Sequence, residues 1–209
     1  MTYYLWKLSF FIRKFRYYSF IMYNKVKFSL LLGKKCGQNL KVAGSLFVFF
    51  GNRNSQLVIG DHFHSLNGYN YNPLSRNIKG AFNIEKDGEL IIGDWVGMSS
   101  VSIRCRSRII IGDNVNIGAD TIIIDSDAHS LNYHDRQRGH SPNLDWENTK
   151  SSPISIGDDV FIGARCIIMK GVTIGNRSII GAGSVVCNNI PNDCVAAGNP
   201  CRIIKYLSK

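Results

Sequence analysis

Residues 154–186 read ISIGDDVFIGARCIIMKGVTIGNRSIIGAGSVV, and within this stretch a small apolar residue returns at every sixth position. The repeated positions are Ile156, Ile162, Ile168, Ile174, Ile180 and Val186. A period of six fits no helix, and it is typical of a β-solenoid in which three short strands make one coil. Glycine follows four of the six positions, as tight turns require, and β-branched residues suit a pleated inward face. The stretch therefore predicts an all-β solenoid, a parallel β-helix.

The same register appears earlier in the chain. Ile-Gly-Asp triplets occur at 59–61, 92–94, 111–113 and 156–158, and Gly-Ala pairs occur at 118–119, 163–164 and 181–182. We therefore expect a β-helix domain over residues 36–205, with a loop insertion at 125–153 and a short tail at 206–209. Residues 1–35 form a separate N-terminal segment, which we expect to be helical and amphipathic.

The charge of the chain is concentrated in this N-terminal segment. The formal net charge is +10, yet ten of the 25 Lys and Arg residues lie within residues 1–60 and Asp61 is the first acid. Eleven aromatic residues precede residue 29. Basic and aromatic residues together suit a nucleic acid or a membrane surface, and the large contiguous apolar side chains favour the membrane. The alternative is a helix that only caps the solenoid or packs in an oligomer.

Lysines and arginines interrupt each apolar run of the segment before it reaches the roughly 18 residues that a membrane span needs. We expect the segment to lie on a bilayer without crossing it, and we expect no signal peptide and no nucleic-acid partner. The six cysteines form no C-x-x-C pair and no compact disulfide framework. Reduced cysteines indicate a cytoplasmic protein, here at the cytoplasmic face of the membrane.

The repeat runs to Ile123 and resumes at Pro153. The polar insertion between these positions contains three of the five histidines, together with several acids, arginines and Trp146. A loop of this length in a compact domain is usually functional or disordered. The histidines, acids and tryptophan favour a functional loop.

A family resemblance follows from five motifs: IGDNVNIG at 111–118, DSDAH at 125–129, PISIGDDVFIGA at 153–164, GVTIG at 171–175 and AAGNPCR at 196–202. Together they resemble the hexapeptide-repeat acyltransferases, and within them the galactoside, maltose and polysaccharide O-acetyltransferases. The resemblance implies a left-handed β-helix of triangular section and a homotrimer with active sites between subunits. It also implies direct transfer of an acetyl group from acetyl-CoA to a sugar hydroxyl.

The resemblance places the catalytic base at His129. A hydroxyl is a poor nucleophile at neutral pH, and histidine is well matched to removing its proton. Asp127 or Asp125 would accept a hydrogen bond from the other ring nitrogen, with Glu147 as a third choice. Ser99 would lie near the acceptor and the thioester. His134 and His140 are the alternatives to His129 as the base.

The resemblance also indicates where coenzyme A and the acceptor bind. The expected coenzyme A residues are small corner residues, one aromatic residue and several cations: Phe161, Gly163, Ala164, Lys170, Arg177, Gly181, Ala182, Arg202 and Lys205. The expected acceptor residues of the insertion are Tyr133, His134, Arg136 and Trp146. Residues 65–81 depart from the repeat, and Tyr71, with Tyr69 and Arg76, is expected to bind a sugar there; the alternative is a loop without a function. The pair His62 and His64 lacks a third ligand, so we expect no metal site.

One departure from the family bears on the acceptor. Relatives that acetylate simple sugars commonly carry acidic residues in the N-terminal helical segment, and this segment has none. This favours a surface polysaccharide or its lipid-linked precursor over a free galactoside or maltose. The alternatives are an N-acetyltransferase of an amino sugar and a non-catalytic, membrane-attached scaffold. A γ-type carbonic anhydrase would need three zinc histidines across adjacent coils, which the repeat lacks.

Overall fold

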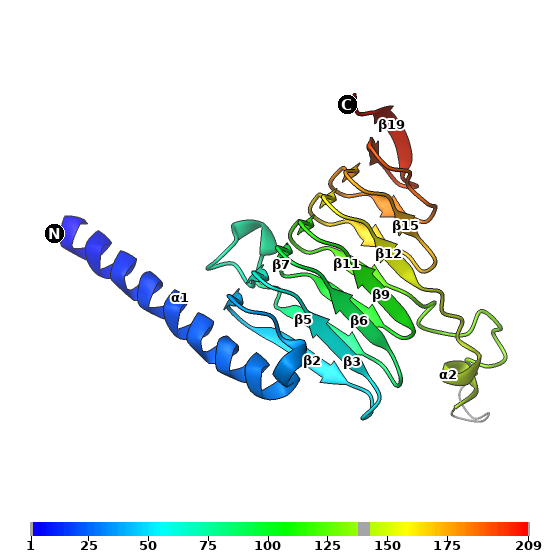
Figure 1. The fold of residues 1–209 in the computed structure, drawn as a ribbon, viewed down its shortest axis with the longest axis horizontal. Helices are drawn as coiled ribbons and strands as arrows, with labels where there is room; N and C mark the ends of the chain where they lie inside the picture. Colours follow the sequence, from blue (N-terminus) through cyan, green and yellow to red (C-terminus); the bar gives the residue numbers. More distant parts are fainter. Residues whose placement is uncertain (1, 138–142, 209) are drawn as a thin grey trace.

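A computed structural model describes residues 2–137 and 143–208. Its main feature is a triangular stack of short strands that follows an N-terminal helix, α1 (Thr2–Leu32), and a single 3-10 turn, η1 (Gly33–Lys35) (Figure 1). Among the described residues the strands form sheets of eight, six and five members. The chain visits the three sheets in turn, and the neighbouring strands of successive coils pair in parallel. The prediction of a left-handed β-helix is confirmed.

The strands are short, as the six-residue period requires. The eight-stranded sheet contains β1 (Lys41–Ala43), β4 (His64–Leu66), β7 (Gly97–Ser99), β10 (Asn116–Ile117), β13 (Phe161–Ile162), β16 (Ile179–Ile180), β18 (Cys194–Ala197) and β19 (Arg202–Tyr206). The six-stranded sheet contains β2 (Leu46–Phe50), β5 (Gly80–Ile84), β8 (Ser102–Cys105), β11 (Ile122–Ile124), β14 (Ile167–Ile168) and β17 (Val185–Val186). The five-stranded sheet contains β3 (Gln56–Ile59), β6 (Glu89–Ile92), β9 (Arg108–Ile111), β12 (Ile154–Ile156) and β15 (Thr173–Ile174).

The core is a set of columns of mainly apolar residues, to which each coil contributes one side chain. In the five-stranded sheet one column consists of Ile59, Ile92, Ile111, Ile156 and Ile174, each paired in register with the next and at most 1% exposed. Because each coil contributes an inward side chain at the same position of its strand, the columns fill the triangular interior without a helix. Full burial of one such side chain contributes roughly 1.5–3 kcal/mol.

The Ile-Gly-Asp triplets have a second role at one corner of the stack. The side chain of Asp113 accepts a hydrogen bond from the backbone N–H of Asp94 at 2.7 Å, and Asp158 accepts one from Asp113 at 2.9 Å. Asn176 continues the series in the next coil, at 3.0 Å from the N–H of Asp158. At Gly112 a Cβ would overlap the side chain of Asp158, so glycine is required there. We call this series of side chains the corner ladder.

The C-terminal half of α1 closes the first coil. Phe28 is fully buried at this end of the core. The side-chain amide of Asn24 donates to the carbonyls of Val42 and Gly44 at 2.9 and 3.1 Å, and Lys27 donates to the carbonyl of Leu46 at 2.8 Å. The N-terminal turns of α1 extend beyond the coils (Figure 1). Within the described residues, no helix is both long enough and apolar enough to cross a membrane.

The insertion leaves the stack at the corner between β11 and β12. It carries one short helix, α2 (Leu144–Asn148), and projects to the side of the coils (Figure 1). A second excursion follows β4 and contains the 3-10 turn η2 (Pro73–Ser75). The side chain of Asn72 caps η2 by accepting a hydrogen bond from the N–H of Leu74 at 3.0 Å.

Candidate active site

The insertion brings a histidine and a carboxylate together. His129 Nδ1 lies 2.6 Å from Asp145 Oδ2, and the other oxygen of Asp145 accepts the backbone N–H of Ser130 at 2.7 Å. The hydrogen bond from His129, followed by that from Ser130, holds the pKa of the Asp145 carboxyl below its usual value. An ionised Asp145 favours a proton on Nδ1, which leaves the lone pair of Nε2 available as a base. The His129 side chain is 69% exposed, so that nitrogen is within reach of a substrate.

Asp145 takes the position that the sequence assigned to Asp125 or Asp127. Asp125 is buried in the stack, where its carboxylate accepts the backbone N–H groups of Arg106, Ser107 and Arg108 at 2.7–2.9 Å. Asp127 instead pairs with Lys170 Nζ at 2.9 Å. The expectation that either carboxylate orients His129 is therefore corrected, and Glu147 has no contact with His129 among the interactions of the described residues. The contact with Asp145 spans sixteen residues of loop, which a local motif does not show.

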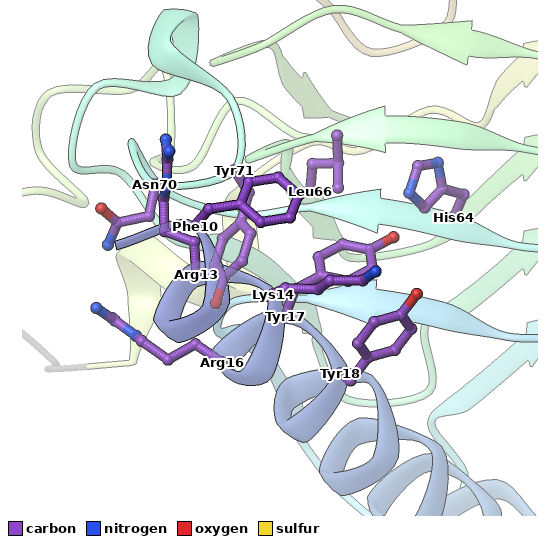
Figure 2. Close-up of a pocket in the computed structure, with 10 residues that line it drawn as sticks. All are labelled: Phe10, Arg13, Lys14, Arg16, Tyr17, Tyr18, His64, Leu66, Asn70 and Tyr71. Carbon is purple, nitrogen blue, oxygen red and sulfur yellow. The ribbon is translucent and has the colours of Figure 1, made fainter. Parts of the chain in front are cut away.

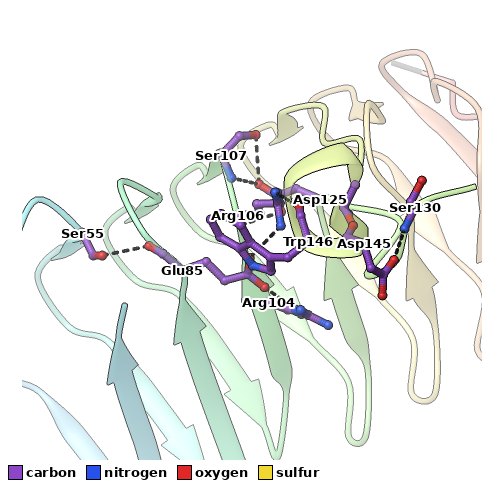
Figure 3. Close-up of polar contacts among 10 residues, drawn as sticks. Ser55, Glu85, Arg104, Arg106, Ser107, Asp125, Ser130, Asp145 and Trp146 are labelled. Atoms are coloured by element: carbon purple, nitrogen blue, oxygen red, sulfur yellow. Dashed lines mark hydrogen bonds and ion pairs between the residues drawn. The ribbon is translucent and has the colours of Figure 1, made fainter. Parts of the chain in front are cut away.

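Helix α2 is attached to the stack through one arginine (Figure 3). The guanidinium of Arg106 lies 4.2 Å from the centroid of the Trp146 ring and donates to the Trp146 carbonyl at 2.6 Å. On its other side Arg106 approaches Glu85 at 3.4 Å, and Glu85 also accepts from Arg104 at 2.5 Å. Trp146, which we expected at the acceptor, thus serves in this chain as the anchor of α2. No sequence motif predicts this pairing, because Arg106 lies 40 residues upstream.

Other loop residues of the expected acceptor set contact one another. Arg136 donates to the carbonyl of Ser130, and the rings of Tyr133 and His134 lie 3.9 Å apart. Asp135 accepts hydrogen bonds from Ser130 at 2.7 Å and Asn148 at 3.0 Å, and so links the two ends of the loop. Tyr133 and His134 are exposed and can reach a ligand, whereas Arg136 braces the loop. His140, an alternative base, lies outside the described residues.

Ser99 lies at a different corner of the triangle. It ends β7 and accepts a hydrogen bond from Asn72 at 3.0 Å. It lines a hollow of about 180 Å³ together with Asn116 and Phe161, which we call the Ser99 hollow. This corner joins the eight- and six-stranded sheets, whereas His129 stands where the six-stranded sheet gives way to the five-stranded one. One chain therefore does not bring Ser99 and His129 to one site.

The expected coenzyme A residues fall into two groups. The small residues Gly163, Ala164, Gly181 and Ala182 stack at one corner, where a Cβ on Gly163 would overlap the backbone of Ala182. Close contact between coils is thus sufficient to explain the glycine. Two expected cations are already paired: Lys170 with Asp127, and Arg177 with Asp193 at 2.6 and 2.8 Å. Arg202 and Lys205 are exposed on β19 and are better placed for phosphates.

Among the described residues, no group of three metal-binding side chains is close enough to hold an ion. His62 stacks on Trp95 with ring centroids 3.7 Å apart and planes at 4°. Tyr71, expected at the acceptor, lies between the sheet and α1, with its ring centroid 6.2 Å from that of Tyr17. Arg76 pairs with Asp120, and Tyr69 is exposed.

Comparison with known proteins agrees with this geometry. The pattern described as "Hexapeptide repeat of succinyl-transferase" matches residues 108–124 and 153–187. The galactoside O-acetyltransferase of Escherichia coli K12 is 41% identical over 100 residues, which cover 48% of this chain and 45% of that enzyme. The chain thus spans about half the length of this curated relative.

Two solved structures share the fold over most of the chain. A hexapeptide-repeat acetyltransferase of Vibrio cholerae in complex with acetyl coenzyme A is 26% identical, covering 88% of this chain and 79% of that one, with a TM-score of 0.55. The polysialic acid-specific acetyltransferase NeuO is 27% identical, covering 83% and 77%, with a TM-score of 0.59. The fold and its repeats define a hexapeptide-repeat β-helix protein. Within that class, the matched repeats and the similarity to acetyltransferases support the resemblance stated above.

Proposed function

We propose that the chain is an acetyl-CoA-dependent O-acetyltransferase that modifies a sugar hydroxyl of a surface polysaccharide or its lipid-linked precursor. The observation that carries the proposal is the His129–Asp145 pair on an exposed loop beside a hexapeptide stack. The family comparisons support acetyl transfer, and an acetyl-CoA complex of a relative supports the donor.

The chemistry requires one base and one stabilised oxyanion. His129 Nε2 takes the proton of the acceptor hydroxyl as its oxygen attacks the thioester carbonyl. The tetrahedral intermediate then expels the thiolate of coenzyme A, which receives the proton from the imidazolium. The products are an acetyl ester and the free thiol. Asp145 is ionised and holds the ring through Nδ1, which stabilises the imidazolium formed in the first step.

The separation of Ser99 from His129 supports a site shared between subunits. We propose a homotrimer in which the loop of one copy approaches the Ser99 hollow of its neighbour. Ser99 would then donate to the oxyanion, and Phe161 would flank the thiol arm of coenzyme A. Arg202 and Lys205 suit the phosphates of the nucleotide, because both are exposed cations on one strand.

We further propose that α1 holds the protein at the cytoplasmic face of the membrane. Its N-terminal turns expose the large apolar side chains of Leu8, Phe11 and Phe15, and residues 1–60 carry no acid. Apolar side chains beside cations suit the interface of an anionic bilayer.

Thiol release from acetyl-CoA in the presence of a sugar panel tests the enzyme proposal. We expect turnover with at least one glycan acceptor and a loss of about 10²- to 10⁴-fold in His129→Ala. Leu131→Ala is the matched control, because Leu131 is an exposed residue of the same loop that belongs to neither expected site. Turnover that survives His129→Ala, or no turnover on any acceptor, contradicts the proposal and favours the scaffold alternative. Transfer confined to amino sugars, with an amide product in the mass spectrum, establishes the N-acetyltransferase alternative.

A further inference from the structure

A pocket of about 540 Å³ lies between α1 and the first coils (Figure 2). We call it the helix pocket. Three cations from one helix line it, Arg13, Lys14 and Arg16, together with the phenol rings of Tyr17, Tyr18 and Tyr71. None of the lining residues in the described part of the chain carries a carboxylate. The pocket is therefore positively charged, and its walls are aromatic.

Two buried polar atoms at this pocket have no partner. Tyr71 Oη and His64 Nε2 make no hydrogen bond with any residue that the structure describes, and both side chains line the pocket. Burial raises the pKa of the Tyr71 hydroxyl, with the charge of Arg16 acting in the opposite direction. The hydroxyl is therefore a donor at neutral pH. Buried polar groups without partners are rare in native proteins, so their presence here indicates a ligand.

The helix pocket adjoins the Ser99 hollow, because His64 and Leu66 line both. His64 lines both of these cavities and also a third of about 370 Å³, which contains Lys41 and Asn116. The three cavities thus lie beside one another around His64, between α1 and Ser99. A ligand bound at α1 can extend to the position where the acetyl group is transferred.

We propose that the helix pocket binds an acidic saccharide, a sugar that carries a carboxylate or a phosphate, as the acceptor. The two arginines suit an anionic oxygen group, and phenol rings provide apolar faces for a sugar ring. The proposal rests on the proposed acetyltransferase function and names the class of its acceptor. It places the charge of the sugar at Arg13 and Arg16, and its hydroxyl toward Ser99.

Saturation-transfer NMR with the full chain tests the binding. The carboxylate probe is a hyaluronan tetrasaccharide with chitotetraose as its neutral control, and the phosphate probe is N-acetylglucosamine 1-phosphate with N-acetylglucosamine as its control. We expect at least one charged probe to bind about tenfold more tightly than its control, and added salt to weaken that binding. The charged probe that binds more tightly than its neutral control identifies the anionic group as a carboxylate or a phosphate. Equal binding of charged and neutral probes overturns the proposal.

Two variants locate the site. The double variant Arg13→Gln/Arg16→Gln should weaken binding of the charged probe about tenfold, whereas Lys25→Gln, an exposed lysine of the same helix outside the pocket, should not. Tyr71→Phe should weaken binding without lowering Tm, because its hydroxyl has no partner among the described residues. A lower Tm with unchanged binding would make Tyr71 structural and contradict the proposal.

A membrane role for the same cations gives a different result. If the double variant loses binding to vesicles of phosphatidylglycerol and phosphatidylcholine but keeps saccharide binding, the cations serve lipid and the proposal fails. Because binding is measured without turnover, saccharide binding with no acetyl transfer supports the binding site but contradicts both the enzyme function and the role of the saccharide as acceptor. Acetylation of neutral sugars with no binding of charged ones supports the enzyme function and contradicts the binding of an acidic saccharide.

Discussion

The guanidinium of Arg106 lies over the ring of Trp146, 4.2 Å from its centroid, and donates to the carbonyl of the same residue. Trp146 directly follows Asp145, the partner of His129. The position of the proposed catalytic pair on the loop therefore depends on a side chain of the stack. We therefore infer that Arg106 is a positioning residue that acts through α2.

Arg106→Leu should lower kcat about 10²-fold, because a displacement of roughly 1 Å in a catalytic group has an effect of that size. KM for acetyl-CoA should change little, since α2 belongs to the insertion whereas the expected coenzyme A residues belong to the coils and β19. Arg108→Leu is the matched control: Arg108 lies two residues away and pairs with Glu89 at 2.7 Å, away from the loop. Steady-state kinetics of both variants decide the point, and equal losses in the two would contradict a positioning role.

Asp145→Asn should reduce kcat by about two to four orders of magnitude, because the amide no longer stabilises the imidazolium or fixes its tautomer. Asp127→Asn breaks the contact with Lys170 and should leave kcat within about threefold of the parent. Parallel kcat measurements test this pair. A larger loss in Asp127→Asn would return the orienting role to the residue that the sequence suggested.

Two substitutions at Asp113 in the corner ladder test whether its side chain stabilises the fold as a hydrogen-bond acceptor or through its charge. Asp113→Ala leaves the N–H of Asp94 without its partner and should lower the free energy of unfolding by about 1 kcal/mol. Asp113→Asn keeps an acceptor oxygen and should be close to the parent, since Asn176 fills the same role in a later coil. Urea denaturation measures both, and an equal loss in the asparagine variant would show that charge is what matters.

His64 predicts a pH dependence of stability. Its pKa is lowered from 6.5, first by burial and then by the charge of Lys41. The unfolded chain therefore binds more protons than the folded chain between the lowered value and 6.5, so stability rises with pH in that window. As pH falls below about 6.5 the folded state should lose stability, until the folded-state pKa is passed. Melting curves from pH 5 to 8 should show a shallower dependence in His64→Gln, and an unchanged slope would contradict this.

The exposed apolar side chains of α1 predict membrane binding through its N-terminal half. The double variant Phe11→Ser/Phe15→Ser should sediment less with anionic vesicles, because each change removes a large apolar group. We expect its partition coefficient to fall about tenfold. Phe49→Ser is the control, since Phe49 is similarly exposed but lies on the stack. Equal sedimentation of all three proteins would contradict a membrane role for α1.

The sequence was sufficient for the stack because its period is short and its contacts repeat. Ile111, Ile156 and Ile174 occupy one column, and each could be placed from the six-residue register alone. The carboxylate partner of His129 could not be placed in the same way. The register ends at Ile123, and the loop then folds back so that a residue sixteen positions later meets the histidine. Proximity in sequence favoured Asp125 and Asp127, whereas the stack uses both for other contacts.

For α1, too, the sequence indicated one role and did not show another. The lack of acids and the dense aromatics indicated a surface contact, but they did not show that Asn24 and Phe28 would tie the C-terminal half to the first coil. The capping role and the exposed apolar face thus coexist, on different halves of one helix. The helix pocket was also hidden, because its cations and Tyr71 lie more than fifty residues apart in the chain.

The corner ladder passes undisturbed across the insertion. Asp94 and Asp113 are separated by 19 residues and Asp113 and Asp158 by 45, yet their hydrogen bonds measure 2.7 and 2.9 Å. The pairing of successive coils is therefore independent of the length of the insertion between them, provided that the chain returns to the next coil. The loop can therefore change in length and sequence without a change in the β-helix that carries it. A related protein could acquire another acceptor by replacing residues 126–152 while every coil kept its place.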